Sequence, residues 1–181
     1  MTDFAESDIK NSRNYLEERK MVLDLAQVHE LEILDIGAGP LSIIAAKDYN
    51  CCVTSIDIDG EELHVWEVEA EKEGVSDRIS FEEEDATNIS YCNDAFDVGV
   101  CYCALHHIPV EKRDEAISEL SRVSSERFII ADYTLEGFLE IHSREDFVPV
   151  DLALLENFLK SSGTMNVIPM GRLVIYTVEK N

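Results

Sequence analysis

The chain has 181 residues, of which 45% are hydrophobic, and this predicts one globular domain that buries a core without disulfides. Its 38 Asp and Glu residues outnumber its 15 Lys and Arg residues and give a formal net charge of −23. This charge argues against nucleic acid or an anionic membrane surface as a partner, because both bind clusters of cations on a protein.

Extended and helical patterns alternate along the chain. In chain order, the sequence predicts a helix over 15–26, a strand over 31–36, a short helix over 41–46, a strand over 52–57, a helix over 63–70, strands over 78–82 and 96–101, a helix over 117–123, a strand over 128–132, a helix over 152–158, and strands over 165–168 and 173–178. This alternation indicates an α/β fold with a parallel sheet and helices on both faces. The last two strands are joined by a short turn, so we expect one antiparallel strand near the edge of the sheet.

Residues 133–150 follow the fifth predicted strand, and we predict that this stretch serves something other than the sheet. It contains His142, Arg144 and Phe147, which are candidates to cover a substrate. The alternative is that these three residues belong to a solvated helix face.

A glycine-containing turn joins the first strand to the first short helix. Gly37 and Gly39 allow positive φ angles and the close approach of a ligand to the backbone. Asp57 ends the next strand, 20 residues after Gly37, which is where an acid binds the hydroxyls of a ribose. The sequence therefore predicts a nucleoside site at the carboxyl ends of these two strands.

Two nucleoside ligands compete for this turn. A dinucleotide site requires a third glycine and backbone donors for a pyrophosphate, whereas this turn has Ser42 at that position and Pro40 lacks an N–H group. S-adenosylmethionine carries no phosphate and needs no such donors. The residues therefore favour S-adenosylmethionine over NAD.

Four motifs resemble those of the class I S-adenosylmethionine-dependent methyltransferases, in particular the group around the ubiquinone and menaquinone biosynthesis methyltransferases. They are Asp-Ile-Gly-Ala-Gly-Pro-Leu at 35–41, Ser-Ile-Asp-Ile-Asp at 55–59, Glu-Asp-Ala at 84–86, and the run from Phe96 to Ile108 that contains Leu-His-His. The third glycine of the first family motif is Leu41 in this chain. The resemblance covers residues 31–178.

The resemblance implies a Rossmann-like, seven-stranded, mostly parallel sheet with an antiparallel last strand and helices on both faces. It further implies S-adenosylmethionine as the cofactor and a small molecule as the methyl acceptor. The cofactor-binding residues it implies are Asp35, Gly37, Ala38 and Gly39 for the methionine portion, Asp57 and Ile58 for the ribose side, Asp85 and Ala86 for the adenine, and Cys101 beside the methyl group.

The resemblance also implies a division of the chain into two parts. Residues 1–30 would form a helical lid over the cofactor, with Asp3, Phe4, Asn14 and Tyr15 as the lid candidates. Residues 31–181 would form the cofactor-binding domain.

Methyl transfer from a sulfonium is an in-line displacement that depends mainly on orientation and on the exclusion of water. It needs a general base only when the acceptor carries a proton of high pKa, so a catalytic triad is not required. His106 and Tyr102 are the catalytic candidates, because they follow the fourth strand at its carboxyl end. The alternative for His106 is a structural role in the turn before Pro109.

The five cysteines are odd in number and form no Cys-x-x-Cys pair, so neither a zinc ribbon nor a redox motif is predicted, and we expect no metal site. Side chains alternate along a strand, so Cys101 and Cys103 are expected on the same side, near the sulfonium. Free cysteines, the polar start of the chain and the absence of a long apolar run predict a cytoplasmic protein without a membrane span.

Two alternatives to a methyltransferase stay open at this point. The first is a degenerate methyltransferase fold that binds a cofactor or a partner without catalysis, which Leu41 favours. The second is an NAD-dependent oxidoreductase, which Ser42 and the Leu-His-His run disfavour. The motifs leave the acceptor and the oligomeric state open.

Overall fold

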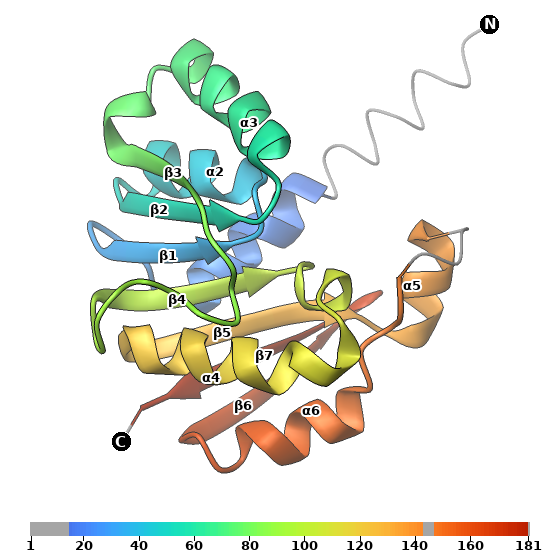
Figure 1. The fold of residues 1–181 in the computed structure, drawn as a ribbon. Coiled ribbons are helices and arrows are strands. Elements are labelled where there is room, and N and C mark those ends of the chain that lie inside the picture. Colours follow the sequence, from blue (N-terminus) through green and yellow to red (C-terminus); the bar gives the residue numbers. More distant parts are fainter. Residues whose placement is uncertain (1–14, 143–146, 181) are drawn as a thin grey trace, which may run out of the picture.

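The fold is that of a computed structural model, which describes residues 15–142 and 147–180. Seven strands form one sheet in the order β3-β2-β1-β4-β5-β7-β6, with helices on both of its faces (Figure 1). The predicted α/β architecture is therefore confirmed.

The sheet is parallel from β3 to β5, and β7 runs antiparallel to both β5 and β6. The strands are β1 (Glu32–Ile36), β2 (Cys52–Asp57), β3 (Ile79–Glu83), β4 (Phe96–Tyr102), β5 (Ser124–Tyr133), β6 (Thr164–Met170) and β7 (Leu173–Glu179). β6 and β7 form the expected hairpin, whose turn contains Gly171 with φ at 58°. The fifth strand starts at Ser124, earlier than the apolar pattern alone predicts.

Helices cover the two faces of the sheet with separate apolar clusters. The helix over residues 15–25, α2 (Pro40–Asp48) and α3 (Gly60–Glu73) pack on one face. α4 (Arg113–Val123) and α6 (Leu152–Leu159) pack on the other. Val22, Leu23 and Ala26 are completely buried, so the helix over residues 15–25 is part of the packed domain. The lid candidates Asp3, Phe4 and Asn14 lie outside the described residues.

The two ends of α3 show why its sequence forms a helix at this place. Asp59 precedes the helix and its carboxylate accepts hydrogen bonds from the N–H groups of Glu61 and Glu62. Gly74 ends the helix in the left-handed conformation, with φ at 72°, which glycine adopts without strain. Asp59 therefore fixes the start of α3 directly after the carboxyl end of β2.

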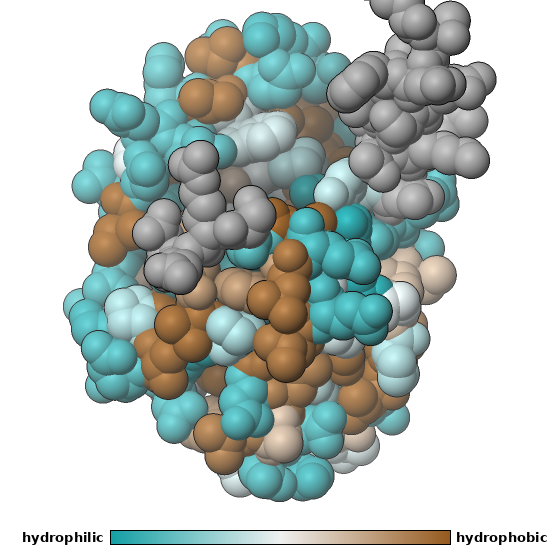
Figure 2. Space-filling view, turned by 90° about the vertical axis from the view of Figure 1, so that its right-hand side faces the viewer, coloured by the Kyte–Doolittle hydropathy of each residue, from teal (hydrophilic) through white to brown (hydrophobic). Residues whose placement is uncertain are grey.

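β1 lies between β2 and β4. From β1 the chain continues to β2 and β3 on one side, and β4 and β5 follow on the other side of β1. The carboxyl ends of β1, β2 and β4 all point to the same edge of the sheet, on the right in Figure 1. In open α/β sheets, ligands bind in the crevice outside such a switch point. Figure 2 looks onto this edge and shows hydrophobic patches surrounded by hydrophilic residues.

The chain between β5 and β6 contains two helices, of which only the second connects back along the sheet. α5 (Leu135–Ile141) extends from the carboxyl edge, and α6 makes the return connection (Figure 1). Arg113 fixes the chain before α6, because its guanidinium donates hydrogen bonds to the carbonyls of Val148 and Pro149 and to those of His106 and Ile108. None of the helices in the described part of the chain is long and apolar enough to cross a bilayer.

Candidate functional site

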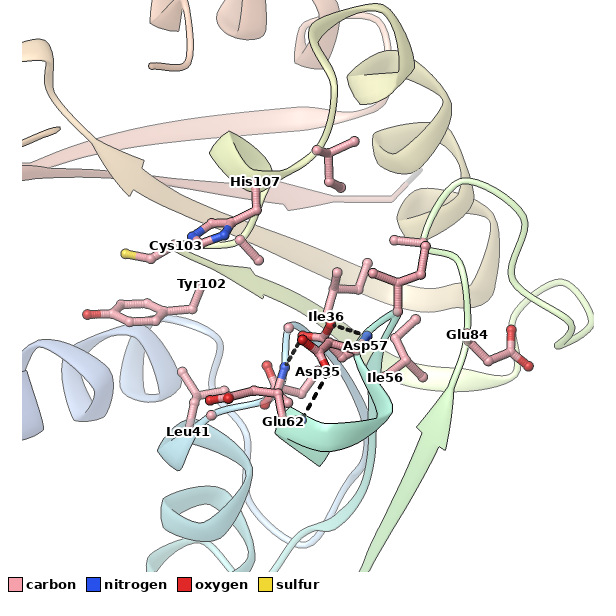
Figure 3. A pocket seen from close by; sticks show the side chains of 18 of the residues that line it. Asp35, Ile36, Leu41, Ile56, Asp57, Glu62, Glu84, Tyr102, Cys103 and His107 are labelled. Atoms are coloured by element: carbon pink, nitrogen blue, oxygen red, sulfur yellow. Dashed lines mark hydrogen bonds between the residues drawn. The ribbon is translucent and has the colours of Figure 1, made fainter. Parts of the chain in front are cut away.

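A cleft of about 700 Å³ opens at the carboxyl ends of β1, β2 and β4 (Figure 3). This volume is within the usual range of about 300–1,000 Å³ for small-molecule sites. All of the predicted site residues line this cleft except Cys101 and His106. The predicted residues that line the cleft are Asp35, Gly37, Ala38, Gly39, Asp57, Ile58, Asp85, Ala86 and Tyr102.

Gly37 is the residue of the turn that must be glycine. Its φ of +99° is one that side-chain-bearing residues rarely adopt, and a Cβ built on it would lie 2.8 Å from the Cβ of Ala104. Its N–H group donates a hydrogen bond of 2.9 Å to the carbonyl of Ile56, which ties the turn to β2. Gly39 differs from the expectation, because its φ of −177° is extended backbone that any residue adopts.

Asp57 joins the glycine turn to the start of α3. Its Oδ2 accepts a hydrogen bond of 2.9 Å from the N–H of Ala38, and its Oδ1 accepts one of 2.9 Å from the N–H of Asp59 (Figure 3). Each carboxylate oxygen retains a second lone pair. The carboxylate is therefore held in one orientation and still has acceptor capacity toward the cleft.

Asp35 is the buried acid of the turn. Its side chain is 1% exposed although the residue lines the cleft, and burial raises the pKa of its carboxyl to about 8. Its Oδ2 is buried and has no hydrogen-bond partner among the described residues. An unpaired buried carboxylate oxygen costs free energy, so this position fits a cationic donor from a ligand.

The far end of the cleft combines an acid with an exposed apolar residue. The Oδ1 of Asp85 accepts hydrogen bonds from the N–H and the hydroxyl of Thr87, at 2.9 Å and 2.7 Å, and these bonds lower the pKa of Asp85. Ile58 is 74% exposed on the cleft wall, which is unusual for so apolar a side chain. This end of the cleft therefore offers a hydrogen-bond acceptor beside an apolar surface.

Tyr102 lies at the opposite end, beside Cys103 and His107 (Figure 3). Its hydroxyl donates a hydrogen bond of 3.4 Å to Glu18, and the guanidinium of Arg19 lies 5.0 Å from the centre of its ring. Burial raises the pKa of the Tyr102 phenol, so the group stays protonated at neutral pH. Tyr102 therefore presents a neutral aromatic side chain to the cleft.

The structure corrects the expected position of Cys101. Its side chain is 3% exposed and packs in the apolar cluster under α4 and α6, outside the cleft lining. Burial raises the pKa of its thiol, so it is not a thiolate. Cys103 does not share its side, because β4 ends at Tyr102 and the φ of Cys103 is +51°. The alternation of a strand therefore stops before Cys103, which lines the cleft instead.

The structure also places His106 away from the cleft surface. The residue is 2% exposed and is not among the cleft-lining residues. Its Nδ1 lies 2.8 Å from the Oδ1 of Asp132, which is itself completely buried at the end of β5. The neighbouring His107 lines the cleft, and burial lowers its pKa to about 4. The catalytic candidate of the pair therefore has no direct contact with the cleft, whereas its neighbour does.

Several lining residues were missed by sequence reasoning. Arg19, Trp66 and Lys112 line the cleft without having been predicted. A signal existed for Trp66, which follows the lining residue Glu62 by one helical turn of α3. Of the three residues expected to cover a substrate, Phe147 lines the cleft, His142 is not among the lining residues, and Arg144 lies outside the described residues.

Known proteins resemble this chain in sequence. The methyltransferase domain family matches residues 33–126. A methyltransferase of Streptomyces halstedii is 31% identical over 123 residues, which are 65% of this chain and 42% of that protein. A demethylmenaquinone methyltransferase of Bacteroides fragilis is 29% identical over 108 residues, which are 58% of this chain and 43% of that protein. The chain spans less than half of the length of these relatives.

Solved structures share the fold at lower identity. A Pyrococcus horikoshii protein has a TM-score of 0.80 at 18% identity, over 94% of this chain and 91% of that protein. The magnesium protoporphyrin IX methyltransferase of Synechocystis, solved with bound S-adenosylmethionine, has a TM-score of 0.73 at 17% identity, over 100% of this chain and 86% of that protein. Together with the match over residues 33–126, the fold and the glycine turn show that this chain belongs to the family of S-adenosylmethionine-dependent methyltransferase domains.

Proposed function

We propose that this protein transfers the methyl group of S-adenosylmethionine to a small-molecule acceptor by in-line displacement. The observation that carries the proposal is the orphaned Oδ2 of buried Asp35, at the same cleft as the fixed carboxylate of Asp57. One of these acids suits an ammonium group and the other suits a pair of ribose hydroxyls. The cofactor contains both groups.

Each part of the cofactor can be matched to residues in one part of the cleft. Asp35 would bind the ammonium of the methionine portion, and Asp57 would accept hydrogen bonds from the ribose hydroxyls. Ile58 would pack on the adenine ring, and Asp85 with Ala86 would lie at its polar edge. In this order the sulfonium, which joins the ribose to the methionine portion, would lie between Asp57 and Asp35. Its methyl group would face the wall that carries the aromatic side chains of Tyr102, Tyr133 and Phe147.

The bound cofactor supplies a methyl group on a sulfonium, and the chain supplies orientation. Holding the acceptor in line with the methyl group can contribute about 7–11 kcal/mol in favourable cases. Tyr133 at the end of β5 and Phe147 after α5 line the cleft and would help to exclude water from it. His107 is the histidine that lines the cleft, so it replaces His106 as the candidate for receiving a proton from the acceptor.

The acceptor is proposed to be small, because the cofactor shares with it a cleft of about 700 Å³. A cytoplasmic location is part of the same proposal. Its support is that all five cysteines, which lie among the described residues, are free, as in a reducing compartment.

Thermal unfolding with S-adenosylmethionine, S-adenosylhomocysteine and NAD in parallel tests the proposal. A ligand at 100 times its dissociation constant adds about 2.7 kcal/mol of stability. For a chain of this size, the midpoint should rise by about 5–10 °C with the first two ligands and stay unchanged with NAD. A rise with NAD alone would contradict the proposed cofactor. A rise with the methyl donor but no methyl transfer to any acceptor would support a scaffold that binds the cofactor.

The buried acid gives a second test, in which cofactor binding releases a proton. The pKa of Asp35 is about 8, so its carboxyl is mostly protonated at pH 7, whereas pairing with an ammonium requires the carboxylate. We therefore expect S-adenosylhomocysteine affinity to weaken as pH falls below 8, by up to about tenfold per pH unit for one coupled proton. Calorimetry at pH 7 in buffers of different ionisation enthalpy measures the released proton directly.

The Asp35→Asn variant is the matched control for this measurement. It keeps the shape of the side chain and removes the titrating group, so its binding should release no proton. Equal proton release by the variant and the unchanged protein would show that another group titrates and would contradict the assignment of Asp35.

A further inference from the structure

Three histidines from two distant segments meet beside the cleft. His106 and His107 lie in the short 3-10 turn η2 (Leu105–His107), and His142 directly follows α5. One ring nitrogen from each lies within 4.8 Å of the other two. The tertiary fold therefore brings together three imidazoles, which are the most common protein ligands for transition metals.

The distance between two of these nitrogens already suits a metal ion. The Nε2 atoms of His106 and His142 are 3.0 Å apart. With zinc–nitrogen bonds of about 2.0–2.1 Å, two ligands of a tetrahedral site lie roughly 3.3 Å apart. The ring centre of His107 lies 4.3 Å from that of His106, on the cleft side of the cluster. One ion between the three rings thus needs only a small adjustment of side chains.

A buried carboxylate orients the central histidine. The Nδ1 of His106 lies 2.8 Å from the Oδ1 of Asp132, and both side chains are 1% exposed. This bond places a proton on Nδ1 and turns the free lone pair of Nε2 toward His142. Metal-bound histidines usually make such a bond to a carboxylate, which fixes the ring and raises its basicity. Asp132 would therefore be a positioning residue for the site.

The surroundings of the three rings are aromatic. Phe138 and Phe147 lie against the cluster, with ring centres 4.8 Å and 5.4 Å from that of His142. His107 and Phe147 both line the cleft, so the cluster forms part of its wall. A metal ion held here would have three protein ligands and an open position, which is the arrangement of catalytic rather than structural zinc sites.

We propose that His106, His107 and His142 bind one divalent transition-metal ion, with zinc as the best-fitting ion, at the wall of the cofactor cleft. The ligand set is neutral imidazole without thiolate, which suits zinc, copper, iron and nickel rather than magnesium or calcium. The sequence predicted no metal site because its cysteine spacing carried no signal and His142 is distant in the chain. The proposal does not depend on methyl transfer, and an ion bound to His107 would occupy the lone pair with which this residue would otherwise accept a proton.

Metal titration of the full-length chain tests the site. The protein is first treated with a chelator and is then titrated with zinc by calorimetry and with cobalt by visible spectroscopy. We expect one zinc ion per chain, and a cobalt spectrum with the d–d bands of a four- or five-coordinate ion and no thiolate charge-transfer band. Thiolate bands would assign the metal to cysteines such as exposed Cys52 and Cys92 and would overturn the proposal.

Three variants decide which residues hold the ion. His142→Ala and His107→Ala should each weaken zinc binding by at least about 100-fold, because each leaves two imidazole ligands. His64→Ala is the matched control, since His64 lies exposed on α3 beside Glu67 and should leave the affinity unchanged. The proposal would be overturned if His142→Ala kept its zinc affinity, or if the chelator-treated protein without substitutions bound no zinc. The three rings would then be held together by hydrogen bonds and packing alone.

Asp132, which contacts His106, gives a readout that a structural role alone would not produce. Asp132→Asn should weaken zinc affinity by about 10–100-fold while one ion per chain still binds at saturation. The circular dichroism and the unfolding midpoint of Asp132→Asn are measured without metal. If the variant is folded in that state, its zinc affinity can be compared with that of the unchanged protein. An affinity equal to that of the unchanged protein would remove Asp132 from the site.

Discussion

Replacing Gly37 with alanine is expected to reduce S-adenosylhomocysteine affinity by at least about 100-fold, which corresponds to about 2.8 kcal/mol. The φ of Gly37 is +99°, and the new Cβ would stand 2.8 Å from the Cβ of Ala104, so the turn must move. A backbone forced into such a conformation costs of order 1–3 kcal/mol, and the move also displaces Ala38 from its bond to Asp57. Calorimetric titration measures the affinity.

Gly74→Ala separates this local effect from the general cost of a left-handed residue. Gly74 also has a positive φ, of 72°, but no atom lies within 4 Å of a Cβ built on it. We expect this variant to lose about 1 kcal/mol of stability and to bind the cofactor normally. Unchanged affinity in Gly37→Ala, or an equal loss in both variants, would show that the turn does not hold the cofactor.

Asp57→Asn is expected to lower cofactor affinity by about 10–100-fold, because hydrogen bonds to a charged group are worth about 1.5–3 kcal/mol. The substitution keeps the size of the side chain and replaces one acceptor oxygen by a donor. That change removes the charge that would bind two ribose hydroxyls and costs one of the bonds to Ala38 or Asp59. Titration with adenosine alongside S-adenosylhomocysteine locates the effect, since both ligands carry the ribose and should weaken together.

Asp97→Asn is the matched control for this variant. The Oδ2 of Asp97 also accepts a hydrogen bond of 2.9 Å from a backbone N–H, that of Glu32, but at the opposite edge of the sheet. Loss of this hydrogen bond should lower the free energy of unfolding and leave the cofactor affinity unchanged. Equal weakening by both substitutions would attribute the effect of Asp57→Asn to the fold rather than to a direct contact.

The cleft combines two kinds of structure. Asp35, Gly37 and Asp57 lie at the ends of central strands and are held by short backbone hydrogen bonds. The opposite wall contains Tyr102, the last residue of β4, and Phe147, which lies on a segment beyond the sheet. Precise cofactor binding is expected from the first part, since rigid elements hold geometry better than loops do. Variation in the second part would change the acceptor without disturbing the cofactor.

The sequence was enough to predict the sheet, its antiparallel strand and the glycine turn. These features follow from local patterns, because apolar runs of strand length, the glycines at 37 and 39 and the acid at 57 act over short distances in the chain. The order of the strands is not among these features, since β3 and β4 follow one another in the chain but have β2 and β1 between them in the sheet. Nearly all of the cofactor-binding residues that were predicted from the motifs do line the cleft.

The orientation of individual side chains depended on the tertiary structure. The strand period placed Cys101 and Cys103 on one side, but β4 ends between them and the backbone of Cys103 turns to a positive φ. His106 and His107 are adjacent, and only the packing of Asp132 from β5 decides that the first is buried and the second faces the cleft. A local pattern contains no information on such a neighbour.

Contacts between distant segments were likewise decided only by the tertiary structure. The helix over residues 15–25 brings Arg19 to the cleft, and the segment after α5 brings His142 to within 3.0 Å of His106. Both contacts join residues far apart in the chain, and the burial of apolar faces on the sheet, rather than any motif, creates them. The motifs therefore predicted the proposed cofactor site, and the packing of the outer segments decided what surrounds it.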